Sequence, residues 1–114
     1  MFLWYPKCST CKAIKEDLEK QGISLTLRNI KEENPTKEEL LVWTTEENIK
    51  KFFNTSGLIY KELKLKEKMD SLSYMDKINL LAQEGMLVKR PIFCIHDKVL
   101  VGGKEIYAYM QERK

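Results

Sequence analysis

The sequence predicts an α/β protein with a four-stranded mixed sheet. Three observations support this prediction: a strand–helix–strand pattern fills residues 1–30, helical patterns fill the middle of the chain, and a strand pair followed by a helix ends it. The chain has 114 residues, of which 43% are hydrophobic, so it can bury a core without disulfides or metals. We therefore expect one domain over residues 1–114, with a helical insertion at about 36–85.

The N-terminal part alternates between strand and helix patterns. Residues 2–5 form a short aromatic-rich run closed by Pro6, which is typical of a buried strand. Apolar residues then recur about one helical turn apart over 10–21, and Gly22 marks the helix end. The alternation over 23–30 predicts a second strand. A right-handed crossover through the helix would make these two strands parallel.

The middle of the chain predicts helices. Three pairs match the spacing of a capping box, which marks a helix start: Thr36 with Glu39, Thr44 with Glu47, and Ser73 with Asp76. Residues 60–68 carry many charges but keep a helical pattern, and Gly85 ends the last of these helices. This part of the chain is therefore a helical block rather than a linker.

The C-terminal part predicts a β-hairpin and a final helix. The run 90–95 is typical of a strand, 96–98 of a tight turn, and 99–101 of a second strand. Two glycines at 102–103 then serve as the turn into a helix over about 104–112. Combined with the parallel pair at the N-terminus, this hairpin completes the four-stranded mixed sheet.

The charge pattern excludes several classes of partner. Charged residues make up 32% of the chain, yet the net charge is only +3, and acidic and basic residues are interspersed. There is no basic block of the kind that follows a phosphate backbone. Pro6 and Lys7 stop the apolar start, and no run approaches the length of a membrane span. We expect a cytoplasmic monomer without direct nucleic-acid or membrane contact, in which structural disulfides are disfavoured.

Cys8 and Cys11 form a CxxC motif between the first predicted strand and the first predicted helix. This places Cys8 at or just before the helix N-terminus, where free N–H groups and the positive end of the helix dipole lower a thiol pKa. Cys11 lies one turn into the helix, on the side that faces Cys8. We therefore expect Cys8 to be the attacking thiol and Cys11 the resolving thiol of a redox pair.

The residues around Cys8 are candidates for substrate binding. Ser9 and Thr10 are small and leave the attacking sulfur accessible. Lys7 and Lys12 add positive charge, which favours the thiolate. We expect Lys7, Ser9 and Thr10 to bind substrate.

Two other interpretations of the CxxC motif stay open. The cysteines could be ordinary half-buried residues, or they could be ligands of a zinc site, which needs about four ligands. Cys94 and His96 could complete such a set, but they follow each other along the late strand and turn, and only one pair has the usual spacing. We therefore expect no metal and no bound cofactor, with Cys94 packed inside as a small hydrophobe and His96 solvated in the turn.

Four stretches resemble, in order, the landmarks of the ArsC/Spx family: YPKCSTCKAIKEDLEKQGI, RNIKEENPTKEEL, FFNTSGLIYKEL and KRPIFCIHDKVLVGGKEIY. The resemblance covers nearly the full length. It implies a thioredoxin-like, glutaredoxin-type fold whose four-stranded mixed sheet carries a helical insertion. The family includes arsenate reductases coupled to glutathione and glutaredoxin, and Spx-type transcription regulators that bind the C-terminal domain of the RNA polymerase α subunit.

The resemblance also gives a role to Arg90 and Pro91. In a thioredoxin-like architecture this proline is usually cis and faces the CxxC motif, so Pro91 would shape the substrate groove. Arg90 would lie beside the sulfur and stabilise its thiolate or an incoming anion. The alternative, which the dipeptide alone favours, is a proline at a strand start next to a solvated arginine.

The chain departs from both characterised branches of the family. Arsenate reductases cradle the oxyanion with three arginines, and only Arg90 matches one of them, because the other two fall near Asn54 and near Gly103 with Lys104 adjacent. The Spx branch does carry CxxC, used as a disulfide switch, but a small glycine in its polymerase-contacting segment, about 45–53 here, is replaced by Asn48.

These observations lead to one leading hypothesis and two alternatives. The chain is expected to be a thiol–disulfide redox protein of unassigned substrate that takes electrons from thioredoxin, glutaredoxin or a low-molecular-weight thiol, and whether it acts as an enzyme stays open. The first alternative is an Spx-type redox-switched regulator that binds the RNA polymerase α subunit. Arsenate reduction is the weaker alternative.

Overall fold

The computed structural model describes residues 1–95 and 98–113, which form two compact units. The first unit joins Met1–Ile30 to Arg90–Lys114, and the second is Lys31–Lys89. The insertion expected at about 36–85 falls inside the second unit, and the single domain over 1–114 stays a prediction. His96 lies outside the described residues. Within the described part of the chain, no helix is both long and apolar enough to cross a bilayer.

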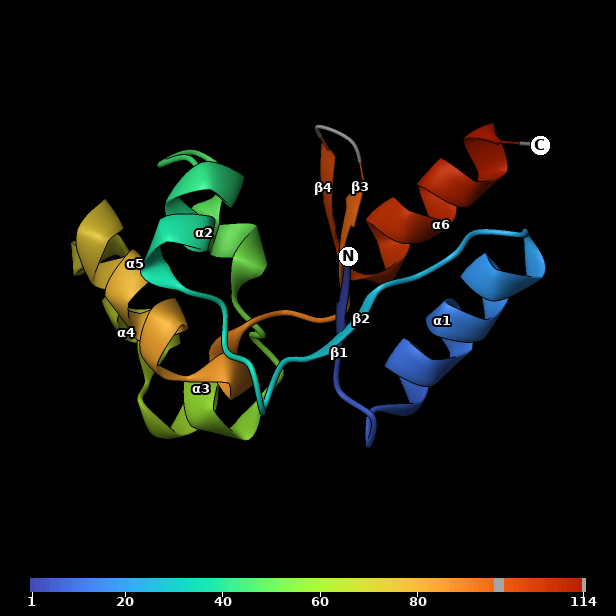
Figure 1. The fold of residues 1–114 in the computed structure, drawn as a ribbon. Coiled ribbons are helices and arrows are strands. Elements are labelled where there is room, and N and C mark those ends of the chain that lie inside the picture. Colours follow the sequence, from blue (N-terminus) through green and yellow to red (C-terminus); the bar gives the residue numbers. More distant parts are fainter. Residues whose placement is uncertain (96–97, 114) are drawn as a thin grey trace. The chain divides into compact units, whose positions relative to one another are not determined.

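The first unit contains a four-stranded mixed sheet in the order β2-β1-β3-β4 (Figure 1). Its strands are β1 (Phe2–Trp4), β2 (Leu27–Asn29), β3 (Ile92–Ile95) and β4 (Lys98–Val101). Strand β1 is parallel to β2 and antiparallel to β3, and β3 is antiparallel to β4. The parallel N-terminal pair and the antiparallel pairing of the two C-terminal strands are therefore confirmed. The tight turn predicted at 96–98 includes residues 96 and 97, which lie outside the described residues.

Strand β2 is much shorter than the alternation over 23–30 predicts. Only Leu27–Asn29 pairs with β1, residue for residue against Phe2–Trp4. Because β2 is an edge strand, its ladder is no longer than that of its partner, and β1 ends just before Pro6. Ile23 and Leu25 still pack against the hydrophobic core. The alternating pattern of residues 23–30 therefore reflects the burial of these side chains and does not extend the strand.

Helices α1 (Ser9–Lys20) and α6 (Gly102–Glu112) lie along the sheet of the first unit (Figure 1). The core cluster joins the sheet to both helices: Phe2, Ile14, Leu18, Phe93, Ile106 and Met110. The rings of Phe2 and Phe93 meet edge to face at 6.2 Å across β1 and β3. The two glycines that were expected to form a turn are instead the first residues of α6.

Gly103 allows α6 to approach α1 closely. A Cβ atom at this position would lie 3.2 Å from Cδ1 of Ile14, which is tighter than ordinary van der Waals contact. Ile14 is fully buried, so it has little room to move aside. The glycine is therefore part of the packing between the two helices.

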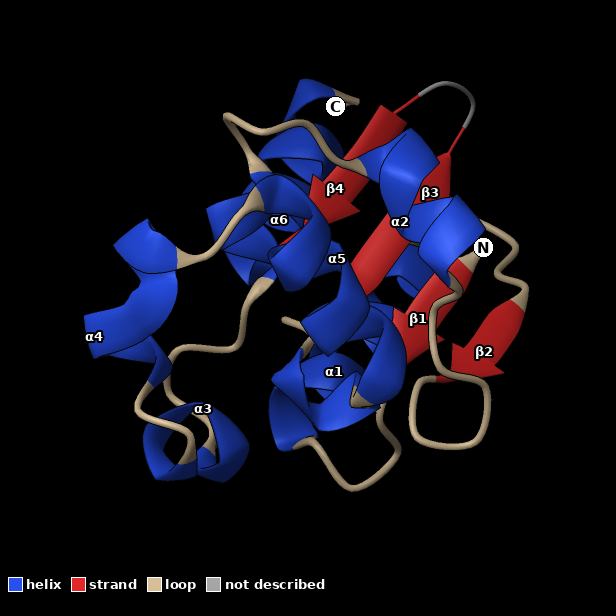
Figure 2. Cartoon of the chain, turned by 90° about the vertical axis from the view of Figure 1, so that its left-hand side faces the viewer, coloured by secondary structure: helices blue, strands red, loops and turns tan. Residues whose placement is uncertain are grey.

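The second unit is helical throughout (Figure 2). Its α-helices are α2 (Lys37–Trp43), α3 (Leu58–Glu62), α4 (Leu65–Lys68) and α5 (Tyr74–Gln83). Two 3₁₀ turns lie between them, η1 (Ile49–Phe52) after α2 and η2 (Met69–Ser71) after α4, and a third, η3 (Gly85–Leu87), follows α5. Complete capping boxes open α2 and α5, as the Thr36–Glu39 and Ser73–Asp76 pairs predicted.

The third predicted capping box, Thr44 with Glu47, is wrong. Thr44 ends α2, and its hydroxyl donates to the carbonyl oxygen of Leu40 at 2.7 Å. The next turn is organised one residue later, where the side chains of Thr45 and Asn48 each accept from the other's backbone N–H. A buried threonine at a helix end can satisfy its hydroxyl within its own helix, which leaves the neighbouring Thr45 to form the turn that leads to Asn48, the N-cap of η1.

The continuous helix expected over 60–68 is also wrong. Lys64 has φ 53 and ψ 41, in the left-handed region, and it separates α3 from α4. Helices α3 and α4 are both short, and each buries a single residue, Tyr60 and Leu65 respectively. Burial of both side chains in one small unit requires the chain to change direction between them.

Helix α1 ends in a Schellman motif, which confirms the helix end predicted at Gly22. The N–H of Gly22 donates to the carbonyl oxygen of Glu19 at 3.0 Å, and the N–H of Ile23 donates to that of Leu18 at 3.2 Å. Gly22 has φ 82, a conformation that side chains disfavour.

We expect Gly22→Ala to lower the free energy of unfolding by about 1–2 kcal/mol. No heavy atom lies within 4 Å of the position of the new Cβ, so the loss is conformational rather than steric. Gly22→Asn is the matched variant and loses less, because asparagine tolerates the left-handed region. Urea denaturation measures both, and equal losses for alanine and asparagine would contradict this explanation.

Candidate functional site

A β-turn carries the chain from β1 to the start of α1. The N–H of Cys8 donates to the carbonyl oxygen of Tyr5 at 2.9 Å, with Pro6 and Lys7 at the turn's corners. Proline suits the first corner because its fixed φ matches this position, where no N–H is needed. Cys8 thereby becomes the N-cap of α1, with φ −92 and ψ 113, as the sequence predicted.

The two cysteines differ sharply in exposure although they belong to one motif. Cys8 is half-buried, whereas Cys11, in the first turn of α1, is fully buried. Both are free thiols. No carboxylate lies in the first turn of α1 to compete for its N-terminus. Cys8 is therefore the sulfur that a substrate can reach, and Cys11 lies behind it.

The surroundings of Cys8 favour its thiolate. Partial burial raises the pKa of Cys8, but the N–H and thiol groups of Cys11, the positive charge of Arg90 and the N–H of Thr10 together bring that pKa below its usual value. Cys8 makes no capping hydrogen bond of regular geometry. The N–H groups at the start of α1 act mainly as oriented dipoles on a negative sulfur.

Cys11 is shifted in the opposite direction. Burial raises the pKa of Cys11 to about 12, and the hydrogen bond to Cys8 and the negative charge on Cys8 add to this rise, although the N–H of Tyr5 and Arg90 oppose it. At neutral pH this thiol keeps its proton and donates it toward Cys8. The pair therefore holds one thiolate and one thiol, with the charge on the outer sulfur.

Arg90 and Pro91 belong to the same unit as the cysteines. The guanidinium of Arg90 lies 5.5 Å from the centre of the Tyr5 ring, and its charge acts on both cysteines. The Arg90–Pro91 bond is cis, as the resemblance implied. Pro91 is buried, and its carbonyl oxygen accepts from the N–H of Gly102 at 2.8 Å.

The remaining predicted site residues lie on the surface. Lys7, Ser9 and Thr10 are exposed around Cys8, and Lys12 is exposed one residue beyond Cys11. The positive charge that lowers the pKa of Cys8 comes from Arg90, which the sequence separates from it by most of the chain. Tyr5 was missed by the sequence analysis.

The predicted burial of Cys94 is wrong, because this residue is only half-buried. The backbone of Cys94 is paired on both sides: its N–H donates to the carbonyl oxygen of Met1 at 2.8 Å, its carbonyl oxygen accepts from the Met1 amino group at 2.9 Å, and Val99 of β4 lies opposite it. Sheet pairing satisfies the backbone and does not by itself cover a side chain, so Cys94 stays partly exposed. Among the residues that the structure describes, no group of three or more His, Cys, Asp or Glu side chains is arranged to hold a metal ion.

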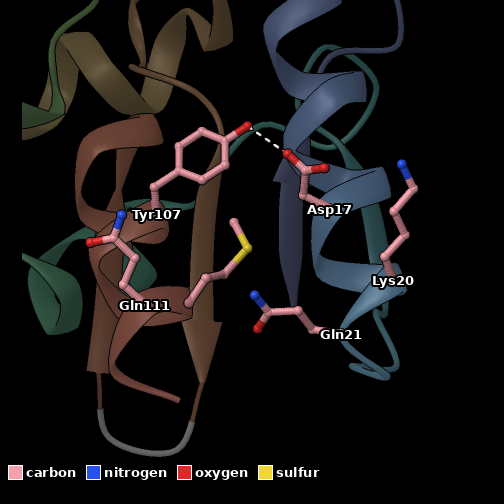
Figure 3. A pocket seen from close by; sticks show the side chains of 6 residues that line it. Asp17, Lys20, Gln21, Tyr107 and Gln111 are labelled. Carbon is pink, nitrogen blue, oxygen red and sulfur yellow. Dashed lines mark hydrogen bonds between the residues drawn. The ribbon is translucent and has the colours of Figure 1, made fainter. Parts of the chain in front are cut away.

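A hollow with a volume of about 390 Å³ lies between α1 and α6 of the first unit (Figure 3). It is lined by Asp17, Lys20, Gln21, Tyr107, Met110 and Gln111. The hydroxyl of Tyr107 donates to Oδ2 of Asp17 at 2.8 Å, and this bond raises the pKa of Tyr107. The hollow contains none of the predicted site residues, so the thiol pair remains the candidate site.

We expect iodoacetamide to alkylate Cys8 and not Cys11 at about pH 7. Cys8 has a lowered pKa and is accessible, whereas Cys11 is buried and keeps its proton until about pH 12. The Cys94→Ser variant removes the third thiol, and peptide mass spectrometry locates the label across a pH series. Equal labelling of both cysteines, or a midpoint for Cys8 at the usual value of about 8.5, would contradict the assignment.

Curated relatives match this chain over most of its length. The uncharacterized protein YusI of Bacillus subtilis is 48% identical over 106 residues, which cover 91% of this chain and 90% of that protein. The global transcriptional regulator Spx of Staphylococcus aureus is 29% identical over 102 residues, which cover 88% of this chain and 76% of that protein.

Solved structures match the whole fold. An ArsC family related protein from Bacteroides fragilis has a TM-score of 0.89 and 45% identity, with 99% of this chain and 95% of that chain covered. A possible arsenate reductase from Streptococcus mutans has a TM-score of 0.84 and 38% identity, with 96% and 95% covered. The chain thus has the α/β thioredoxin-like fold that its sequence implied. Since residues 3–107 also match the ArsC family directly, this chain belongs to the ArsC family.

Proposed function

We propose that this chain is a thiol–disulfide redox protein in which Cys8 attacks and Cys11 resolves. One observation carries the proposal: the accessible sulfur at the N-terminus of α1 has a lowered pKa, and the buried sulfur one turn later has a raised pKa. An attacking thiol must be ionised and reachable, whereas a resolving thiol must wait until the first has reacted.

In the first step the Cys8 thiolate attacks one sulfur of a substrate disulfide. The substrate S–S bond breaks, a new S–S bond joins Cys8 to one half of the substrate, and the other half leaves as a thiolate that takes a proton from water. Arg90 faces the negative charge before this step and helps to hold an ionised nucleophile. Ser9, Thr10 and Lys7 are exposed around Cys8, where substrate arrives, and Pro91 belongs to the same unit.

In the second step Cys11 attacks the sulfur of Cys8. Formation of the mixed disulfide removes the charge on Cys8, and with it two of the influences that raise the pKa of Cys11. Cys11 then gives up its proton, forms the Cys8–Cys11 disulfide and releases the second half of the substrate as a thiol. The substrate gains two electrons, and the cysteine pair loses two.

A thiol reductant must restore the pair after each cycle. Thioredoxin, glutaredoxin or a low-molecular-weight thiol could donate the two electrons by the same exchange in reverse, first at Cys8 because it is the accessible sulfur. Arsenate reduction is not part of this proposal. Asparagine, glycine and lysine occupy the region of the two further arginines at 54, 103 and 104, and a multiply charged oxyanion needs several cationic donors.

We expect the Cys11→Ser variant to accumulate a mixed disulfide with oxidised glutathione. Without the resolving thiol the first step has no onward route, so intact-mass spectrometry should show one glutathione per chain. The wild type should instead lose two hydrogens and keep no adduct, and Cys8→Ser should do neither. All three chains carry Cys94→Ser to silence the third thiol. Reaction of Cys8→Ser at the wild-type rate would sink the proposed function.

A second candidate is an Spx-type regulator whose Cys8–Cys11 bond switches binding to the RNA polymerase α subunit. The 29% identity to the global transcriptional regulator Spx favours it. The segment expected to contact polymerase, 45–53, buries its three large apolar side chains, Ile49, Phe52 and Phe53, in the second unit. Its exposed part is polar and charged, so any contact made through this segment would be polar.

A capture experiment with the polymerase α C-terminal domain separates the two candidates. The regulator predicts that one redox state of the chain is retained and the other is not. We expect retention of neither, because the apolar side chains of segment 45–53 are committed to their own unit. Cys8→Ser, which cannot form the disulfide, is the control for the oxidised state. Retention of only one redox state would favour the regulator.

A further inference from the structure

We propose that Tyr5 is a positioning residue of the thiol site: its ring holds the guanidinium of Arg90 next to the cysteine pair. The inference deepens the proposed function and rests on it, because it assigns a role within the same site. In this role the Tyr5 ring acts on the cysteines through Arg90.

The contact between Tyr5 and Arg90 is a cation–π contact. The central carbon of the guanidinium lies 5.5 Å from the centre of the Tyr5 ring, within the range in which a cation is attracted to an aromatic face. Both residues are half-buried, which weakens the competition from water. An arginine side chain has many rotamers, so a flat partner of this kind reduces the number of positions its charge can take.

The backbone of Tyr5 ties this ring to both cysteines. Its carbonyl oxygen accepts from the N–H of Cys8 at 2.9 Å, and its own N–H acts on the sulfur of Cys11. Pro6 restricts the backbone of the residue before it to extended conformations, so Tyr5 has little freedom where it leaves β1. The backbone of Tyr5 is therefore restrained next to the thiols. This limits the positions of its ring, and the ring in turn limits the positions of the Arg90 guanidinium.

Tyr5 thus explains how a distant arginine acts on Cys8. The groups that act on Cys8 are Arg90, Cys11 and the N–H groups at the start of α1. Of these only Arg90 has a long side chain that could move away, so its influence depends on what holds it. Removal of the ring should take away one contact that positions Arg90, reduce the effect of its charge and raise the pKa of Cys8.

The test is a double-mutant cycle read out by the pH dependence of Cys8 alkylation, in the Cys94→Ser background. Tyr5→Leu removes the ring, and Tyr5→Phe keeps it. We expect Tyr5→Leu to slow alkylation below the thiol pKa roughly two- to fivefold, and Tyr5→Phe to leave it unchanged. In an Arg90→Gln chain, Tyr5→Leu should have no further effect, because the charge it positions is already gone.

Tyr109 supplies a matched control. Its ring also lies near an arginine, Arg113, at 5.8 Å, but that pair lies at the end of α6, and Arg113 is not among the groups described as acting on Cys8 or Cys11. Tyr109→Leu should leave the alkylation profile unchanged. Tyr5→Met, which fills similar space without an aromatic face, replaces Tyr5→Leu if circular dichroism shows that the leucine variant is unfolded.

Each outcome bears on one of the two proposals. Suppose that the midpoint of Cys8 alkylation is lowered in the wild type, and that Tyr5→Leu and Tyr5→Met do not change it. This result would overturn the role of Tyr5 and leave the proposed function standing. If Tyr5→Leu slows the alkylation of Cys8 equally in the wild-type and Arg90→Gln backgrounds, the role of Tyr5 is also overturned, because the effect then does not depend on the arginine. A wild-type midpoint at the ordinary value would overturn the proposed function itself.

Discussion

The β-turn from Tyr5 to Cys8 is the feature on which the chemistry of this chain depends. One hydrogen bond, from the N–H of Cys8 to the carbonyl oxygen of Tyr5, closes the turn between β1 and α1. It places the first cysteine as the N-cap of α1 and the second one turn inside. Without this turn the two cysteines would be neighbours in sequence only. With it they have different solvent exposure and different electrostatic surroundings, which is the basis of the order of reaction proposed for them.

Apolar packing in the core of the first unit fixes the two elements that flank this turn, β1 and α1. Phe2 and Leu3 are fully buried in β1, and Ile14 and Leu18 are fully buried in α1. Each side of the turn is therefore fixed by apolar packing on the same sheet. Burial of a large aliphatic or aromatic side chain contributes about 1.5–3 kcal/mol, so the elements that flank the turn are held far more strongly than the turn could hold itself. The exposed residues at the turn can then vary with little effect on the sheet.

Features that depend on neighbouring residues could be predicted from the sequence. The CxxC motif at a helix start, the capping boxes at Thr36 and Ser73, and the helix end at Gly22 all rest on contacts within a few residues. Features that depend on distant partners could not. The length of β2 is limited by β1, and the exposure of the Cys94 side chain depends on which distant residues pack over its face of the sheet.

The same distinction applies within the candidate site. Cys8 and Cys11 could be predicted as a thiol pair because the CxxC spacing and a helix start are both local features of the sequence. The stacking of Arg90 on Tyr5 joins residues from the two ends of the chain, and no local pattern marks it. Lys7 and Lys12 are nearer to Cys8 in sequence, but a charge acts through distance and solvent exposure rather than sequence separation. Arg90 is half-buried, whereas both lysines are exposed.

The packing of α6 against α1 bears on why one cation acts at this site. Position 103, near which the resemblance places a further arginine of the reductases, is a glycine whose Cβ would crowd the buried side chain of Ile14. A longer side chain there would have to displace a core residue, so close helix packing and an oxyanion cradle compete for the same place.

A thiolate carries a single negative charge on one atom, and one well-positioned guanidinium can face it. A tetrahedral oxyanion spreads its charge over several oxygens and needs donors from several directions. With glycine at position 103 the two helices pack closely, and the site that results suits sulfur chemistry better than oxyanion chemistry.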